Sequence, residues 1–332
     1  MNDLDAVHLA PLVSGRSGGV VSGLGPSDEL DDLRGAQARI GERVVGRERE
    51  LELVLAAVAS GRDIVLEGAP GTSKTTMLKA ITAEWGLPLL LVEGNADLTP
   101  TKLIGHHPPS AVLREGYTAE SFVPGPLTEA MQQGGFLYIE ELNRAPDDTL
   151  NTLLMAMADR EIAIPRFGAV RAQSSFRVIG SMNPFDNVGT TRLSASILDR
   201  FCRLVVDYQD EVAEREVVRR LVPAGAAPAA VAPALVHDAV RVVRATRAHP
   251  DLRMGSSVRG AIDMVHVAGR LCALRGIDVA AGSAYHDMVH DAIVVALSGR
   301  IHVDEAADRT PEDVLREIWA ALADDGSPAA PG

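Results

Sequence analysis

A glycine-rich loop between an apolar run and a helical pattern most constrains how this chain can fold. Residues 63–67 (DIVLE) have the composition of a buried strand, and the residues after 75 have helical periodicity. Between them lie Gly68, Ala69, Pro70, Gly71, Thr72, Ser73, Lys74, Thr75 and Thr76. Glycines let successive backbone N–H groups curl around phosphate oxygens, and the helix N-terminus adds partial positive charge. We predict a loop that binds the phosphates of a nucleotide.

Within this loop each polar residue has an expected task. Lys74 is expected to reach the β- and γ-phosphates, and the Thr75 hydroxyl to ligate Mg²⁺. Ser73 stands where the pattern usually has glycine. Serine is small, so the loop conformation remains accessible.

Apolar runs and helical patterns alternate along the first two thirds of the chain. Four runs follow the first one, at residues 89–93, 136–140, 176–182 and 203–207. Strands separated by helices predict a parallel sheet with helices on both faces. After about residue 210 the runs stop and amphipathic helical patterns continue. We therefore expect an α/β nucleotide-binding domain over 36–210 and an all-helical lid domain over 211–322.

Composition narrows the class of protein. Across 332 residues, 32 Lys and Arg stand against 45 Asp and Glu, a net charge of −13. This acidity makes nucleic acid an unlikely partner, although nearly half of it lies in the tails 1–35 and 323–332, which we expect to be disordered. The two cysteines, Cys202 and Cys272, lie far apart, which fits a reducing cytoplasm. The longest apolar stretches are too short to span a membrane.

Carboxylates and an amide follow two later strands. Glu140 ends the run FLYIE, about 65 positions after the loop, and Glu141 follows it directly. The first acid is expected to hold hydrated Mg²⁺ and the second to polarise a water, so the pair predicts hydrolysis as well as binding. Asn183, after the run 176–182, is expected to orient that water. Arg200 precedes the last strand and is a candidate arginine finger acting in a neighbouring subunit, with Arg192 as its rival.

Together these motifs resemble the AAA+ ATPases, and most closely the MoxR family. The phrases that carry the resemblance are GAPGTSKT at 68–75, EELNRAP at 140–146, SMNP at 181–184 and LDRF at 198–201. A small residue before the lysine is typical of that family. The family mostly has Asp where this chain has Glu140, which affects the expected rate rather than the chemistry.

The resemblance implies further site residues and a mode of action. Val45 and Gly46 resemble the segment that packs on adenine, and Arg259 resembles the sensor-2 arginine that reaches the γ-phosphate from the lid. Residues 97–126 resemble the insertion in the family's second helix, and residues 161–174 read as a hairpin; both would face a client. The implied protein is an ATP hydrolase that requires Mg²⁺ and forms a homo-oligomer, by default a hexameric ring.

Four functions remain open on this basis, and the last of them is a non-enzymatic, nucleotide-gated scaffold. The leading one is remodelling or maturation of a partner protein, in some cases metal-cofactor insertion, with a von Willebrand factor A domain protein as a possible partner. The alternative is the motor subunit of a magnesium- or cobalt-chelatase complex. A nucleic-acid-acting AAA+ protein is less favoured, because neither a basic stripe nor the activator loop is found in the sequence. The sequence does not name the client.

Overall fold

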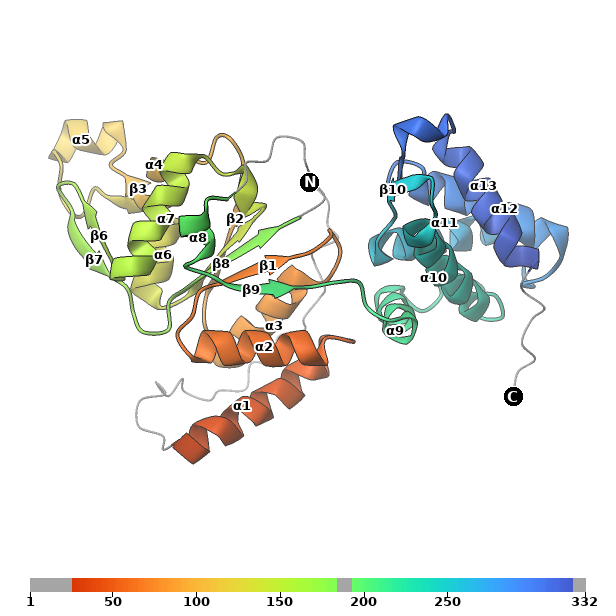
Figure 1. The fold of residues 1–332 in the computed structure, drawn as a ribbon, viewed down its shortest axis with the longest axis horizontal. Helices are drawn as coiled ribbons and strands as arrows, with labels where there is room; N and C mark the ends of the chain where they lie inside the picture. Colours follow the sequence, from red (N-terminus) through yellow and green to blue (C-terminus); the bar gives the residue numbers. More distant parts are fainter. Residues whose placement is uncertain (1–25, 184–192, 325–332) are drawn as a thin grey trace.

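The computed structural model describes residues 26–183 and 193–324. Figure 1 shows two lobes, an α/β lobe built around a sheet and a helical lobe, joined where strand β9 (Cys202–Val205) leads into helix α9 (Glu211–Leu221). This junction lies at the position where the strand-like runs stop in the sequence.

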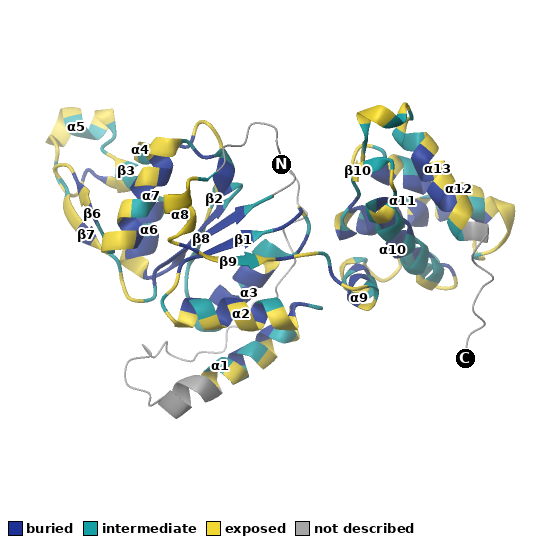
Figure 2. Ribbon diagram, viewed as in Figure 1, coloured by how far each residue is buried: buried dark blue, intermediate teal, exposed yellow. Residues whose placement is uncertain are grey.

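The α/β lobe is organised by a five-stranded sheet with the order β2-β5-β8-β1-β9. Every pairing in it is parallel. The first four strands are β1 (Ile64–Glu67), β2 (Leu89–Glu93), β5 (Phe136–Glu140) and β8 (Arg177–Met182). The five predicted runs therefore form the predicted parallel sheet, and its central strands are buried (Figure 2).

Helices cover both faces of the sheet because alternate strand residues point to opposite sides. On one face, Leu66 and Tyr138 pack with helices α1 (Pro26–Gly41), α2 (Glu48–Ala59) and α3 (Lys74–Trp85). On the other, Leu137 and Val178 pack with α4 (Pro100–Ile104), α6 (Pro126–Gln133) and α7 (Asp147–Asp159). The phosphate loop enters α3 and therefore lies on the first face.

Two additions project from the side of the α/β lobe away from the lid (Figure 1). The first contains α5 (Pro109–Glu115) and the two-residue strands β3 (Gly105–His106) and β4 (Val123–Pro124). The second is the hairpin of β6 (Glu161–Ile164) and β7 (Gly168–Arg171), whose antiparallel pairing confirms the predicted hairpin. Phe122 and Phe167 join the two, with ring centroids 4.6 Å apart.

The lid contains α9, α10 (Ala232–Ala248), α11 (Val258–Arg275), α12 (Gly282–Leu297) and α13 (Pro311–Asp324) around its own apolar core. It also contains a small antiparallel sheet of β10 (Leu252–Met254) and β11 (His302–Val303), so the lid is not entirely helical as predicted. These strands are too short to give a recognisable alternating pattern. Single 3₁₀ turns occur at Leu142–Arg144 and Glu305–Ala307.

Helix α1 corrects the predicted N-terminal boundary. It begins at Pro26, within the segment 1–35 that composition predicts to be disordered. Ala36 and Ile40 are buried in the core with α2 and α3, and Arg39 pairs with Glu84 of α3. Burial of these two apolar side chains stabilises a helix whose other residues are mostly polar. At the other end, α13 continues to Asp324, past the predicted boundary at 322.

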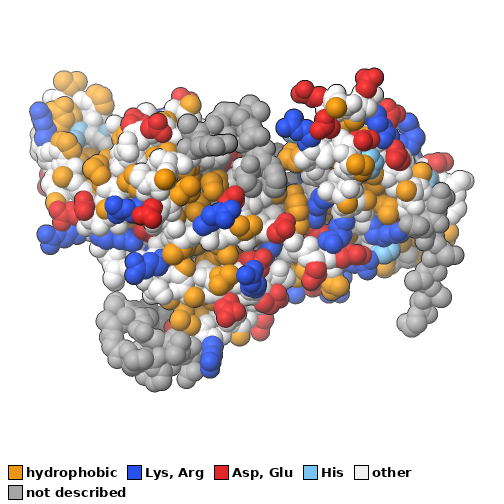
Figure 3. Space-filling model, in the orientation of Figure 1, with side chains coloured by type: hydrophobic (Ala, Val, Ile, Leu, Met, Phe, Trp, Pro, Cys, Tyr) orange, Lys and Arg blue, Asp and Glu red, His pale blue; other side chains and the backbone are white. Residues whose placement is uncertain are grey.

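The surface carries mixed charge. On the face shown in Figure 3, acidic and basic side chains are interspersed, with no continuous basic stripe across the two lobes. Within the described residues, no helix has the length and apolarity needed to cross a membrane.

Candidate nucleotide site

The phosphate loop has the backbone that its sequence requires. Gly71 and Ser73 both have positive φ, 78° and 65° respectively. Ser73 is therefore a non-glycine residue in the left-handed region, which explains why glycine is expected there. A side chain at Gly68 would place Cβ 2.1 Å from the carbonyl oxygen of Val206, so only glycine fits between the loop and the end of β9.

Lys74 is held inside the loop by its own backbone. Its Nζ donates to the carbonyl oxygens of Gly68 (2.9 Å) and Ala69 (2.8 Å) and to Thr72 Oγ1 (3.1 Å). Burial lowers the pKa of Lys74 to about 8; Glu140 opposes this shift, and the charges of Arg47 and Arg259 add to it. A bound anion would favour the charged lysine and reverse the shift.

The acidic end of β5 meets the first turn of α3. Thr75 Oγ1 donates to Glu140 Oε1 at 2.5 Å, joining the two residues predicted to hold Mg²⁺. Glu141 follows in the left-handed region, with φ 53° and ψ 45°, which turns its side chain away from the strand. There Glu141 Oε2 lies 3.0 Å from Arg144 Nη1.

Asn183 comes directly after β8, the strand between β5 and β1. The amide of Gly68 donates to the carbonyl oxygen of Met182 at 3.0 Å, so the end of β8 is fixed against the start of the phosphate loop. Parallel strands place their carboxyl ends at one edge of a sheet. Asn183, Glu140 and Lys74 therefore share that edge.

The lid closes over the same loop. A Cβ built on Gly71 would lie 2.5 Å from Ser257 Oγ and 3.8 Å from Arg259 Cγ. Ser257 immediately precedes α11, and Arg259 is in the first turn of that helix. The predicted sensor arginine is thus brought to the phosphate loop, close enough to affect Lys74.

The segment predicted to contact adenine packs on the linker between the lobes, residues 206–210, and on the start of α9. Gln209 Nε2 donates to the carbonyl oxygen of Val45 at 2.7 Å. Gly46 has φ 62°, and a Cβ there would lie 2.4 Å from that of Ala213. The next residue, Arg47, is 2% exposed and donates to the carbonyl oxygen of Asp207 at 2.6 Å.

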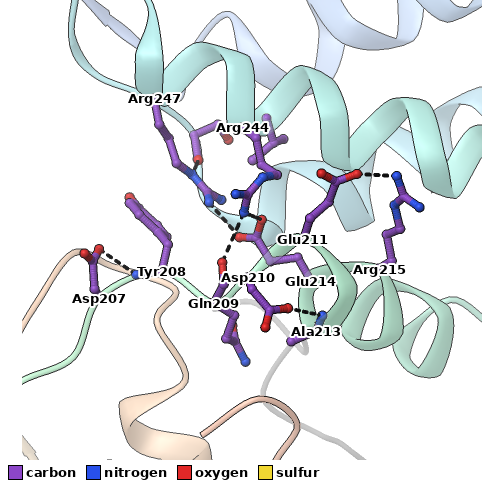
Figure 4. A network of polar contacts seen from close by, with 12 residues as sticks. Asp207, Tyr208, Gln209, Asp210, Glu211, Ala213, Glu214, Arg215, Arg244 and Arg247 are labelled. Atoms are coloured by element: carbon purple, nitrogen blue, oxygen red, sulfur yellow. Dashed lines mark hydrogen bonds and ion pairs between the residues drawn. The ribbon is translucent and has the colours of Figure 1, made fainter.

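An ionic network anchors the lid to this linker (Figure 4). The Glu214 carboxylate accepts from Arg247 Nη1 (2.6 Å) and Arg244 Nη1 (3.1 Å). Arg244 also donates to the carbonyl oxygen of Gln209 (3.1 Å), and Arg247 Nε to that of Ser256 (2.7 Å). The Arg247 guanidinium lies 3.7 Å from the centroid of the Tyr208 ring.

Arg200 is not brought to its own phosphate loop. It is exposed, between α8 (Ala195–Leu198) and β9. At the start of β9, Cys202 pairs with Ile64, whereas Val205 at its end pairs with Glu67, the residue before the loop. At about 3.3 Å per residue, the strand separates Arg200 from that loop by more than about 10 Å. The rival Arg192 lies outside the described residues.

The residues that meet at this edge fit a nucleoside triphosphate with Mg²⁺. Lys74, Arg47 and Arg259 supply positive charge around the loop. The Thr75 hydroxyl and the Glu140 carboxylate are hard oxygen ligands of the kind Mg²⁺ prefers.

Sequence reasoning missed several residues at this site. Arg144 pairs with Glu141, and its i, i+3 spacing within EELNR is the signal that indicates it. Tyr138 lies behind Glu140, two positions earlier on the same face of β5. Glu214 and its arginine partners are about 30 positions apart in the sequence, so no local pattern indicates that they pair.

Three comparisons place the chain among known proteins. A family profile described as AAA domain (dynein-related subfamily) matches residues 63–201. Chaperone MoxR1 of Mycobacterium tuberculosis is 27% identical over 328 residues, covering 90% of this chain and 84% of that protein. Uncharacterized protein YojN of Bacillus subtilis is 32% identical over 169 residues, covering 49% of this chain and only 55% of YojN.

Among solved structures, a variant of RuvB from Thermotoga maritima has a TM-score of 0.50 at 18% identity. The match covers 76% of this chain and 71% of that one. At this identity the likeness concerns the fold alone.

Proposed function

The chain is a MoxR-type AAA+ protein, as its motifs predict, and from this premise we propose that it hydrolyses ATP to remodel a partner protein. The observation that carries the proposal is the contact between Thr75 and Glu140, 65 positions apart in the sequence. It joins the phosphate loop to the acidic strand end in the arrangement that hydrolysis of a nucleoside triphosphate requires.

Each residue of the site then has a defined task. Mg²⁺, when bound at Thr75 and Glu140, would neutralise phosphate charge. Glu141 polarises the attacking water and accepts its proton, and Asn183 orients that water. Lys74 and, from the lid, Arg259 stabilise the negative charge that develops on the transferred phosphoryl group.

The Glu141→Gln variant tests the hydrolytic step. We expect it to bind ATP with near wild-type affinity and to lose at least about a hundredfold in the rate of phosphate release, because glutamine cannot accept the proton. Glu52→Gln, on the exposed face of α2, is the matched control and should leave the rate unchanged. Wild-type phosphate release from Glu141→Gln would refute the assignment.

Assembly into a ring, by default of six subunits, is part of the proposal. Its support is the location of Arg200, which is exposed at the end of β9 opposite the phosphate loop of its own chain. An arginine so placed can complete only the site of a neighbour. The ATPase rate per chain should therefore rise with protein concentration, and Arg200→Ala should abolish it while leaving ATP affinity largely intact. A concentration-independent rate would contradict assembly.

The partner is proposed to bind the two additions at the far side of the α/β lobe. Tyr117 of the insert contacts the hairpin through Arg166, whose guanidinium lies 4.0 Å from the ring centroid. Leu113 of α5, in the same insert, is 87% exposed. A von Willebrand factor A domain protein is one candidate partner. We place the complex in the cytoplasm, where ATP is available. Affinity capture with the Glu141→Gln chain, held in its ATP state, would name the client.

The chelatase-motor alternative makes a different prediction. If it is right, insertion of a divalent metal into a tetrapyrrole fails in cells that lack this chain. Normal metal insertion in a deletion strain would exclude that role without affecting the remodelling proposal.

A further inference from the structure

A tyrosine hydroxyl is buried in the middle of the central sheet, directly behind the residues proposed to hold Mg²⁺. Tyr138 is 1% exposed, and its neighbours along β5, Leu137 and Ile139, are apolar and also buried. Phenylalanine would fill the same space without a polar atom. Because a buried hydroxyl is unfavourable unless it is hydrogen-bonded, its partners show what it stabilises.

The hydroxyl is bonded to the neighbouring strand, because it donates to Ser181 Oγ of β8 at 3.0 Å. It also lies close enough to the side chains of Thr75 and Glu140, which are bonded to each other, for both to influence its pKa. Burial raises the pKa of Tyr138 to about 12, so the group remains a protonated donor at neutral pH.

Strand geometry connects this contact to both catalytic strand ends. Alternate residues of a strand share a face, so Tyr138 and Glu140 are on the face toward α3. On β8, Ile179 is opposite Tyr138 and packs in the same core, so Ser181 follows on that face as well, two residues before Asn183. The bond between Tyr138 and Ser181 thus joins β5 to β8 two residues before Glu140 on one strand and two residues before Asn183 on the other.

We propose that Tyr138 is a positioning residue for this site: its bond to Ser181 fixes the end of β5, which carries Glu140, relative to the end of β8. The proposal rests on the proposed ATPase function. Its physical reason is the extra methylene of Glu140, which gives the carboxylate one more rotatable bond than an aspartate would have. A hydroxyl that is held by Ser181 and lies beside the Thr75–Glu140 pair limits by contact the space in which that carboxylate can turn.

Removing the hydroxyl alone tests this role. In Tyr138→Phe we expect kcat to fall about tenfold, as for loss of one oriented hydrogen bond in the transition state, with little change in the KM for ATP. The Mg²⁺ concentration for half-maximal activity should rise. Ser181→Ala should have a similar effect, and the double variant should be no worse than either, because both remove the same bond. Ser181→Ala also serves if Tyr138→Phe does not fold.

The matched control removes a buried tyrosine hydroxyl elsewhere. Tyr285 of the lid donates to Asp238 Oδ2 at 2.7 Å, and Tyr285→Phe should leave the Mg²⁺ dependence unchanged. A rescue variant separates positioning from stability. Tyr138→Phe with Glu140→Asp should turn over ATP faster than Tyr138→Phe alone, because the shorter acid has less freedom to lose. A general loss of stability would not be repaired by that second change.

Binding measurements keep this inference separate from the proposed function. If the wild-type chain shows no turnover, the proposed function fails, but Mg²⁺ titration of the ATP-bound wild type and Tyr138→Phe still reports on the site. Weaker Mg²⁺ binding in Tyr138→Phe supports the positioning role. Equal Mg²⁺ affinity, or equal kcat and Mg²⁺ dependence where turnover is present, would overturn it.

Discussion

Replacing Glu214 with glutamine should destabilise the lid, because Glu214 of α9 pairs with two arginines of α10. The carboxylate is 2% exposed and accepts from Arg247 at 2.6 Å and from Arg244 at 3.1 Å (Figure 4). Glutamine has nearly the same shape but no charge. The change therefore weakens two charge-assisted bonds without creating a cavity.

The magnitude follows from the exposure of the two arginines. Arg247 is 13% exposed, and a hydrogen bond between charged groups at such a site contributes about 1.5–3 kcal/mol. Arg244 is 38% exposed, so solvent screening limits its share to about 1 kcal/mol or less. Since glutamine keeps one neutral acceptor, we expect Glu214→Gln to destabilise the lid by about 2 kcal/mol.

The two tryptophans allow each lobe to be followed separately. Trp319 lies in α13 of the lid and is 5% exposed, whereas Trp85 lies in α3 of the α/β lobe. In a Trp85→Phe background, urea unfolding monitored by Trp319 fluorescence reports on the lid. With a slope of about 2 kcal/mol per molar urea, Glu214→Gln should lower the midpoint by about 1 M.

Glu216 provides a matched control two positions along the same helix. It also pairs with two arginines, Arg219 and Arg220, but this cluster lies at the surface, where water screens it. Glu216→Gln should barely move the Trp319 midpoint. Equal shifts in the two variants would refute the view that burial makes the Glu214 network matter.

Three further predictions concern the phosphate loop. The pKa of Lys74 is about 8 without an anion, and a bound phosphate raises it, so ATP binding takes up a proton. ATP affinity should therefore fall about tenfold between pH 7 and pH 9. Calorimetry in buffers of different ionisation enthalpy measures the proton uptake, and a pH-independent affinity would contradict the prediction. Gly68→Ala would press Cβ against the Val206 carbonyl oxygen and should abolish ATP binding with a lowered melting temperature, whereas Gly86→Ala, with no neighbour within 4 Å, should retain binding. Ser73→Gly relieves a left-handed serine and should raise the unfolding free energy of the α/β lobe by up to about 1 kcal/mol; a loss of stability would show that the Ser73 side chain is needed.

The sheet could be predicted because its three central strands, β5, β8 and β1, are buried on both faces. Such strands are continuous apolar runs, and all five sequence runs are strands to within two residues. Their spatial order could not be read from local pattern, since it depends on which crossovers pack. The start of α1 was missed because residues 26–35 include four acids, and the apolar residues that the helix buries, Ala36 and Ile40, come after them.

At the site, local motifs indicated the residues proposed to bind phosphate but not the residues that pack around them. Lys74 and Glu140 belong to patterns with fixed neighbours, and the common edge of parallel strands brings them together. Tyr138 reads as one more large apolar residue of a strand until its hydroxyl partner on β8 is known. Glu214 reads as an exposed acid of an amphipathic helix, because its arginines come from α10.

The linker and the phosphate loop belong to one chain of contacts. Arg47 and Val45 bind the linker from the α/β lobe, and Gln209 passes the contact to Arg244 of the lid. From there the Glu214 network reaches Arg247 and the carbonyl oxygen of Ser256, and the next residue, Ser257, touches Gly71.

Lid movement therefore has a definite structural cost. If the lid rotates away from Gly71, the loop at Ser256 and Arg247 of α10 move together, because both belong to the lid. Carrying Arg247 along breaks its contact with Tyr208, because Tyr208 belongs to the linker. Whatever holds Arg259 at the phosphates therefore also stabilises the packing around Glu214. By linkage, ATP should protect the backbone amides of residues 244–257 from hydrogen exchange in the wild type, and Glu214→Gln should lose much of that protection. Equal protection in both chains would show that the lid and the site are not coupled through this network.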